Sequence, residues 1–242
     1  MLKHLKLLPL IMILPIIVNA KTPPLFGKII TGSNEVVKIE KEYSNFDKIE
    51  ISNAFKSNIT FSKDYSIEIS INENFVKHLN VIKRGRTLRI FLDPQYSYKR
   101  MDNRVDITLP HLEELRLSGA SQADVEGFDH DNQFVLHLSG ASKVNGSLNT
   151  GDLKIRLSGA SSIDFKGKGK HLDINASGAS TIRLMDFEVD NADIDISGAT
   201  TAKVFVNDKL EISMSGASKI RYSGNCVIES INSSGASSVK RL

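Results

Sequence analysis

Ile155-Arg156-Leu157-Ser158-Gly159-Ala160-Ser161-Ser162-Ile163 is one of seven copies of a pattern that fills the second half of the sequence. Its centre is the tripeptide Ser-Gly-Ala followed by Ser or Thr, and it recurs at intervals of 18 to 21 residues. The motif serines are Ser118, Ser139, Ser158, Ser177, Ser197, Ser215 and Ser234. Self-similarity at a short, near-constant period is typical of a protein built from stacked repeats.

Apolar residues flank each motif at alternate positions. Around Ser158, the residues Ile155, Leu157 and Ile163 are apolar, whereas the positions between them are polar. A period of two is the signature of a strand with one buried face. A repeat of this length cannot enclose a core alone, so the copies must stack and pair strand with strand. We therefore predict an all-β fold, a parallel β-solenoid of ~19-residue coils that lie ~4.8 Å apart.

The motif residues suit the corner of such a coil. Glycine adopts positive φ without strain, so we expect the motif glycines to be structural turn residues: Gly119, Gly140, Gly159, Gly178, Gly198, Gly216 and Gly235. The Ser or Thr after the alanine shares strand parity with an inward column, which predicts a buried row of hydroxyls bonded to one another or to nearby backbone. A flat outer array that orders ice is disfavoured, because Lys143 and Lys219 interrupt the neighbouring exposed column.

The first twenty residues have the three-part layout of a secretory signal peptide. Lys3 and Lys6 precede an apolar run over residues 7–18, and Val18-Asn19-Ala20 offers small residues before a cleavage point. The run is too short to span a bilayer as a helix, and no later stretch approaches the ~20 apolar residues that a span needs. We expect an exported mature chain without a transmembrane segment, located in the periplasm, at the cell surface or outside the cell.

The rest of the chain divides into a leader and one domain. We expect an N-terminal leader over residues 21–43 and a single β-solenoid domain over residues 44–242. Within that domain, residues 44–111 are predicted to form irregular coils and residues 112–242 the seven regular repeats. Ser52-Asn53-Ala54-Phe55 resembles a weak eighth copy of the motif.

Two segments of the irregular part break the strand pattern. Residues 72–78 predict one helical turn capped by Asn72. Residues 93–104 predict a loop, because Pro94 interrupts the strand and polar residues follow.

Charge and cysteine content exclude several classes of protein. The formal net charge is +3, and removal of Lys3 and Lys6 with a signal peptide lowers it to +1. A nucleic-acid-binding domain is usually far more basic, so no nucleic-acid partner is expected. The lone cysteine, Cys226, rules out a disulfide framework within the chain and a cysteine-rich zinc site. No phosphate-binding loop or catalytic signature motif is present, and we expect no cofactor.

An acidic patch is the only candidate for chemistry. Asp173, Asp193, Asp195 and Glu211 fall on outward positions of adjacent coils, close enough for weak metal binding or acid–base catalysis. Lys154 and Arg156 share that face, so a solvated, charge-paired surface is the favoured interpretation and no metal site is expected.

Two groups of residues are candidates for binding. An outward column changes from acidic or amide residues to basic ones, and its basic members Arg183, Lys203 and Arg221 suit an acidic partner such as anionic glycan or lipid headgroups. In the predicted loop, Tyr96, Tyr98 and Arg100 suit protein or sugar contacts. The last repeat has no distinct cap before Leu242, which predicts self-association or a partner that covers this end.

Several segments together resemble a known family. Phe46-Asp-Lys-Ile-Glu-Ile-Ser-Asn-Ala-Phe55, Tyr65-Ser-Ile-Glu-Ile69 and Leu88-Arg-Ile90, followed by the Leu-Ser-Gly-Ala-Ser series, are similar to the head GIN domain family over residues 44–242. Members of that family are called auto-transporter adhesins of bacterial envelopes. The resemblance implies a secreted or surface β-solenoid and supplies no catalytic residues.

The sequence therefore predicts an exported, non-enzymatic binding or adhesion module of the bacterial cell envelope, which presents outward polar columns to an envelope protein or glycan. One alternative is a polysaccharide-active β-helix enzyme that uses the acidic patch. Another is a purely structural envelope protein that associates with itself.

Overall fold

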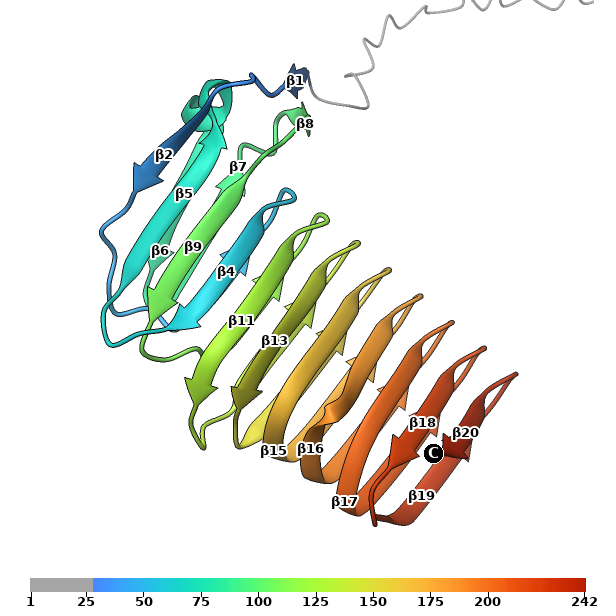
Figure 1. Ribbon diagram of the computed structural model, residues 1–242. Coiled ribbons are helices and arrows are strands. Elements are labelled where there is room, and N and C mark those ends of the chain that lie inside the picture. The colour runs from blue at the N-terminus through green and yellow to red at the C-terminus, as the bar shows by residue number, and fades with distance from the viewer. Residues whose placement is uncertain (1–27) are drawn as a thin grey trace, which may run out of the picture.

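Each Ser-Gly-Ala motif closes the corner between two strands of one coil. β12 (Phe134–Leu138) runs into the motif, and β13 (Lys143–Asn149) leaves it on the other side of the coil. β14 (Asp152–Leu157) then returns beside β12 in parallel register, with Leu136 opposite Ile155. Repetition of this lap builds the parallel β-solenoid of the computed structural model, which describes residues 28–242 (Figure 1).

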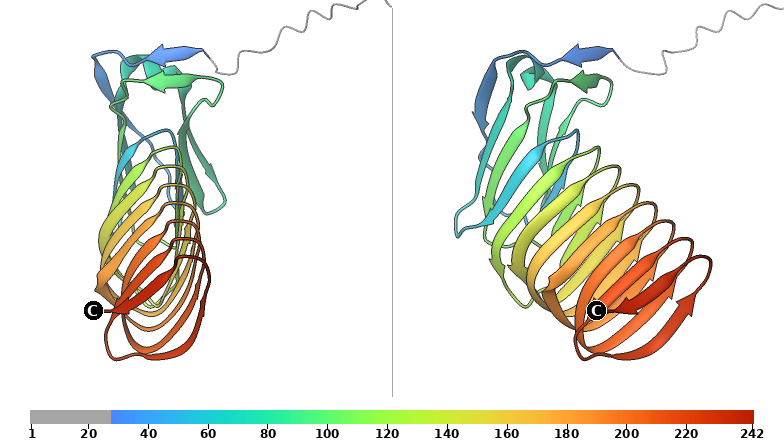
Figure 2. Two further views of the ribbon diagram at one scale, coloured as in Figure 1. Left: turned by 90° about the vertical axis from the view of Figure 1, so that its right-hand side faces the viewer. Right: turned by 45° about the vertical axis from the view of Figure 1, so that its right-hand side comes forward.

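Two sheets face each other across a narrow interior, so the coils look flattened when viewed along the stack (Figure 2). The first sheet contains, in stacking order, β6 (Leu79–Arg84), β7 (Thr87–Leu92), β3 (Lys48–Ile51), β10 (Glu114–Leu117), β12, β14, the second halves of β15 (Ser162–Ala176), β16 (Thr181–Ile196) and β17 (Thr201–Met214), and β19 (Val227–Ser233). The second sheet contains β2 (Val36–Glu40), β5 (Ser66–Asn72), β9 (Arg104–Leu109), β4 (Lys56–Phe61), β11 (Gln122–Asp129), β13, the first halves of β15 to β17, β18 (Lys219–Ser223) and β20 (Ser238–Arg241).

The motif glycines stack in a column along one edge of the solenoid. All seven have φ between +62° and +90°. At Gly159 an added Cβ would lie 2.4 Å from the carbonyl oxygen of Gly140, on the coil before. The Ala160 N–H donates to that same oxygen at 2.8 Å. Glycine is thus required here both by the backbone conformation and by the approach of the neighbouring coil.

The weak copy at Ser52 belongs to the same column. Asn53 and Ala54 both have positive φ, and the Ala54 N–H donates to the Gly119 carbonyl at 3.0 Å. Asparagine is among the residues that tolerate this region best, which explains why a glycine can be missing here.

The hydroxyls that follow the motif alanines point into the solenoid. Six of them are at most 1% exposed: Ser121, Ser142, Ser161, Ser180, Thr200 and Ser218. Each donates to the carbonyl of the motif serine three residues earlier, for example from Ser121 Oγ to Ser118 at 2.8 Å. The bonds therefore run to the backbone and not from hydroxyl to hydroxyl, and they satisfy polar groups that the corner buries.

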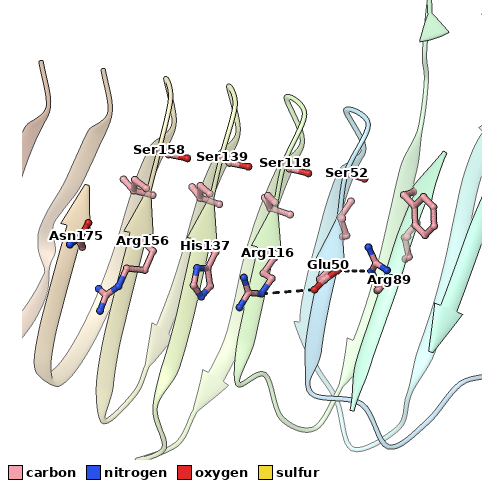
Figure 3. Close-up of a pocket in the computed structure, with 16 residues that line it drawn as sticks. Glu50, Ser52, Arg89, Arg116, Ser118, His137, Ser139, Arg156, Ser158 and Asn175 are labelled. Atoms are coloured by element: carbon pink, nitrogen blue, oxygen red, sulfur yellow. Dashed lines mark hydrogen bonds and ion pairs between the residues drawn. The ribbon is translucent and has the colours of Figure 1, made fainter. Parts of the chain in front are cut away.

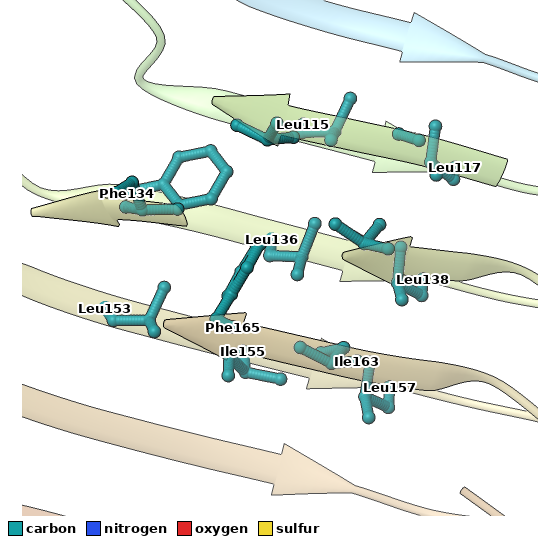
Figure 4. Close-up of a cluster of buried hydrophobic side chains, with 14 of the residues drawn as sticks. Leu115, Leu117, Phe134, Leu136, Leu138, Leu153, Ile155, Leu157, Ile163 and Phe165 are labelled. Atoms are coloured by element: carbon teal, nitrogen blue, oxygen red, sulfur yellow. The ribbon is translucent and has the colours of Figure 1, made fainter. Parts of the chain in front are cut away.

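Aliphatic side chains fill the interior rung by rung. Leu115, Leu136 and Ile155 lie above one another in one column and are fully buried, and Leu117, Leu138 and Leu157 form the next column (Figure 4). Phe134 and Phe165 meet across the interior, with ring centroids 6.3 Å apart. This alternation of buried and outward positions is the one that the repeat predicts.

The N-terminal end departs from the regular stack. The sequence predicts a less regular β segment at this end, and the structure has one. Two of its coils, β3–β4 and β7–β9, stack in parallel. The other strands pair antiparallel, β5 with β2 and β9, and β6 with β7. The tight turn at Gly85 joins β6 and β7 as a hairpin, where a coil would need a lap around the core. These antiparallel strands cover the end of the apolar interior.

The order of coils in space also differs from the order in sequence. β3 pairs with β7 on one side and with β10 on the other. The coil of residues 48–61 therefore lies between the coil of residues 87–109 and the first regular repeat.

Short segments before and beside the solenoid are ordered too. The predicted leader contributes β1 (Ile29–Thr31) and β2, while the predicted signal peptide lies outside the described residues. The helical turn is present as η1 (Glu73–His78), but Asn72 makes no capping bond and instead donates to the Ser33 carbonyl. The predicted loop over residues 93–104 contains the short strand β8 (Ser97–Lys99), which pairs in parallel with β1. In residues 28–242, no helix is long and apolar enough to cross a membrane.

Gly178→Ala is expected to lower the free energy of unfolding by at least about 2 kcal/mol. The new Cβ would combine a φ of +90° with a 2.4 Å approach to the Gly159 carbonyl oxygen. Gly85→Ala is the matched control, because φ is +57° there but nothing lies within 4 Å of the added atom. Urea titrations followed by circular dichroism compare the two, and equal losses would show that close stacking of the coils contributes nothing.

Thr200→Val is expected to destabilise the fold by about 1 kcal/mol, because the Ser197 carbonyl would lose the 3.0 Å bond from a hydroxyl that is fully buried. Thr201→Val makes the same exchange one residue further on, where the side chain points outward, and should change stability by less than about 0.5 kcal/mol. Thermal unfolding of both variants measures the difference. A neutral Thr200→Val would mean that the buried hydroxyl row does not stabilise the corner.

Candidate functional site

A polar groove with a volume of 430 Å³ follows the outer surface of the first sheet (Figure 3). Two parallel columns of outward side chains line it. The charged column runs through Arg89, Glu50, Arg116, His137, Arg156 and Asn175. The serine column runs beside it through Ser52, Ser118, Ser139 and Ser158.

Strand parity places these two columns next to each other. In each coil the residues one and three before the motif serine point inward, as Leu117 and Leu115 do. The motif serine and the residue two before it must then point outward on the same face. Because β7, β3, β10, β12 and β14 are in parallel register, equivalent side chains repeat about every 4.8 Å along the groove.

Carboxylates hold the arginines of the groove in place. Arg89 Nε donates to Glu50 at 2.6 Å, and Arg116 pairs with Glu114 and lies 4.0 Å from Glu50. Arg89 also lies over the Phe91 ring, 5.3 Å from its centroid. Both guanidiniums thus use the Nε side for these contacts, and their terminal nitrogens have no hydrogen-bond partner among residues 28–242.

His137 lies between two guanidiniums on adjacent rungs. Its Nε2 is 3.7 Å from Glu114. Partial burial and the charges of Arg116 and Arg156 lower the pKa of His137 below its ordinary value, against a smaller opposing effect of Glu114. The imidazole is therefore neutral near pH 7.

Arg156 lies near the end of the groove that is next to the acidic patch. Its two terminal nitrogens bind both carboxylate oxygens of Asp173 at 2.8 and 2.7 Å, a bidentate pair. The hydrogen bonds and charge of Arg156 lower the pKa of Asp173. Asp173 is therefore fixed as a carboxylate.

The hydroxyls of the motif serines line the groove. The carbonyls of Ser118, Ser139 and Ser158 accept bonds from the buried hydroxyls, but their own Oγ atoms have no hydrogen-bond partner among residues 28–242. Figure 3 shows these oxygens aligned along one side of the groove. A row of free hydroxyls beside guanidiniums can donate and accept hydrogen bonds to a polar ligand.

The four predicted acidic residues do come together. Asp173, Asp193 and Glu211 occupy successive rungs, Asp195 lies one pleat further along its strand, and together they line a shallow hollow of 200 Å³. His171 Nε2 is 3.3 Å from Asp193. A general acid needs a raised pKa, whereas that of Asp173 is lowered. Among residues 28–242, no cluster of three or more His, Cys, Asp or Glu is arranged to hold a metal ion.

The predicted basic column is continuous on the second sheet. Arg183, Lys203 and Arg221 are register neighbours on β16, β17 and β18, and Lys240 continues the row. The same column begins with Asp106, Asn58 and Asp124 at the other end of the stack. It lies on the face opposite the polar groove, so the structure does not bring the two groups of cations together.

The aromatic residues of the 93–104 segment pack inward. Tyr98 meets Phe75 edge-on at 5.1 Å, its hydroxyl donates to the Asp93 carbonyl at 3.0 Å, and burial raises its pKa to about 12. Tyr96 packs against His78 with the ring centroids 4.6 Å apart and the rings tilted by 56°. Of the three predicted residues, only Arg100 is exposed.

The sequence analysis missed the serine column and the arginines beside it. The signal was available in the parity of the repeat, since residues one and three before the motif serine are apolar and the serine itself must face outward. What parity does not reveal is that β3 and β7 extend the same columns, because their place in the stack follows from pairing between distant segments.

These features define a β-solenoid with a polar groove whose side chains repeat once per coil. Residues 45–226 match the model of the family described as "Putative auto-transporter adhesin, head GIN domain". The match covers most of the sequence, and the chain belongs to this family. The resemblance seen in the sequence is thereby confirmed.

Solved structures share the fold. A "putative adhesin" from Bacteroides fragilis superposes with a TM-score of 0.82 at 17% identity, over 88% of this chain and all of that one. A "putative lipid binding protein" from Parabacteroides distasonis gives 0.72 at 18%, over 89% of this chain and all of that one. A second "putative adhesin" from Parabacteroides distasonis gives 0.66 at 18%, with the same coverage. No curated protein matches the chain.

The pair of Asp173 and Arg156 is expected to make stability fall in acid. Because the folded pKa of Asp173 is lowered, its contribution is complete above the ordinary value of 3.8 and is lost as the pH falls through the folded pKa. The melting temperature of Asp173→Asn should lie below that of the unmodified protein near pH 7, and the two should converge near pH 2. A difference that stays constant over this range would contradict the assignment.

Proposed function

We propose that the protein is an exported, non-enzymatic binding module of the bacterial cell envelope, with the polar groove as its main contact surface. The observation that carries this proposal is the groove itself, where the hydroxyls of Ser118, Ser139 and Ser158 repeat on successive rungs. Beside them the terminal guanidinium nitrogens of Arg89 and Arg116 lie two rungs apart and have no hydrogen-bond partner among residues 28–242. Parallel strands with a packed core hold these groups rigidly, so a ligand that binds them need not order the site first.

The family and the solved structures support an envelope role. The family description names an adhesin, and the structural neighbours are called adhesins or, in one case, a lipid-binding protein. The predicted signal peptide supports export. We propose the basic column of Arg183, Lys203 and Arg221 as a secondary surface for an acidic envelope partner, since exposed positive charges on one face attract negatively charged molecules.

The enzymatic alternative has less support. A polysaccharide-cleaving acid–base pair needs one carboxyl that stays protonated near neutral pH. Asp173 is held as a carboxylate by Arg156, and Asp193 lies beside His171. The acidic patch thus resembles a surface of paired charges and not a catalytic pair of one protonated and one ionised carboxyl.

Export is tested by producing the full chain in a bacterial host and measuring the mass of the purified protein. Cleavage after Ala20 is expected, which would make Lys21 the first residue. Recovery of the intact chain from the cytoplasm would contradict export.

Binding is tested by titrating the exported protein against purified polysaccharides, isolated cell envelopes and vesicles of anionic phospholipid. Saturable binding without release of new sugar ends is expected. Release of sugar ends that disappears in Asp193→Asn combined with Asp195→Asn would favour the enzyme instead. Concentration-dependent assembly without any ligand would favour a purely structural role.

A further inference from the structure

We infer that the polar groove binds a linear acidic polysaccharide, with the polymer lying along the stack and its sugars following the rungs. This inference rests on the proposed binding function and names the class of ligand for its site. It is carried by three features of the groove, namely its repeat distance, its charge and its row of hydroxyls.

The repeat distance suits an extended sugar chain. From Arg89 on β7 to Asn175 on β15 the charged column crosses six successive rungs, a length of about 24 Å at 4.8 Å per rung. A sugar ring in an extended chain advances by a similar distance. Successive sugars of such a polymer can therefore contact the serines of successive strands. A compact ligand is too short to contact more than one or two of them.

Two arginines of the groove, two rungs apart, suit carboxylates or sulfates on the polymer. Arg89 Nε donates a hydrogen bond to Glu50, and Arg116 Nε forms an ion pair with Glu114. The terminal nitrogens of both arginines have no hydrogen-bond partner among residues 28–242 and present the two-donor geometry that binds a carboxylate. The carboxylates of Glu50 and Glu114 repel other anions, which lowers the affinity of the groove for small anions in general. A ligand therefore also needs hydroxyls that can bond to the serine column.

The serine column supplies that second requirement. Ser118, Ser139 and Ser158 lie two residues along the strand from the charged column, about 7 Å away. One edge of a sugar ring can then place its acid group on an arginine while ring hydroxyls on the other edge bond the serines. A planar layer of lipid headgroups meets a groove only at its rims, so the shape favours a single polymer strand over a membrane.

The first experiment compares two acidic polysaccharides with the uncharged ester of one of them. The full exported protein is titrated with polygalacturonate and alginate, and with the methyl ester of polygalacturonate, by calorimetry in about 0.15 M salt. Binding to an acidic polymer and none to the ester is expected. Failure to bind either acidic polymer, with binding to envelopes intact, overturns this inference but not the proposed function. Failure to bind anything overturns both.

The second experiment locates the contact with paired variants. Arg89→Gln with Arg116→Gln should weaken binding at least about tenfold, as expected when one charge-assisted hydrogen bond is lost. Lys63→Gln with Lys166→Gln removes the same charge at two exposed positions outside both the groove and the basic column, and should change binding less than about twofold. Equal losses in both variants, or a larger loss in the second, would assign binding to net charge and overturn the inference. Circular dichroism and melting temperature verify that each variant is folded.

The third experiment tests the hydroxyls without touching charge. Ser118→Ala, Ser139→Ala and Ser158→Ala are combined. Since these Oγ atoms have no hydrogen-bond partner within residues 28–242, the fold should keep its stability. Binding is expected to weaken at least about tenfold. The control combines Ser197→Ala, Ser215→Ala and Ser234→Ala, which lie in the same column outside the groove and should leave affinity unchanged. Unchanged affinity in the first triple variant, or tighter binding of anionic vesicles than of any polysaccharide, would overturn the inference.

Discussion

The structure depends on the close approach of consecutive corners. Over the last five coils a glycine with left-handed backbone accepts, through its carbonyl, the N–H of the alanine on the next coil, at 2.7 to 2.8 Å. From Gly159 onward, a Cβ at the corner glycine would lie 2.4 to 2.6 Å from the glycine carbonyl oxygen of the coil before. This contact sets the distance between coils at one edge, and the strands keep their register next to the corner. Register shifts occur only further along the strands, for example between Asp164 and Lys166. Apolar columns can stack inside only because the distance between coils is constant.

The same constancy produces the outer surface. A strand that turns leucine and isoleucine inward must turn its intervening residues outward, and equal rungs place those residues in straight rows. The arginine and serine rows are therefore a by-product of the packing of the core, available to be used without any special loop. Differences between rows arise only from which residue occupies each rung. The first sheet passes from arginines to carboxylates along the stack, while the second passes in the opposite sense.

The regular part of the fold could be predicted because its information is local. One repeat contains its corner glycine, its two inward columns and its buried hydroxyl, and the seven copies repeat that information. The antiparallel strands at the N-terminal end could not be predicted in this way. β5 alternates polar and apolar residues just as β4 does, and nothing in either pattern states the direction of its partner. Tyr96 and Tyr98 resembled exposed contact residues for a related reason, since their burial depends on η1 and His78 coming from elsewhere in the chain.

The unusual place of the coil of residues 48–61 has a kinetic consequence. Its strand β3 pairs with β7 across 39 positions and with β10 across 66, whereas β10 and β12 pair across 21 and β12 and β14 across 19. Contacts between distant segments form slowly and nearby ones quickly. We therefore expect the strands of the N-terminal segment to pair more slowly than one regular lap adds to another. A chain that emerges from a membrane pore amino end first gives this slow segment the longest time to pair.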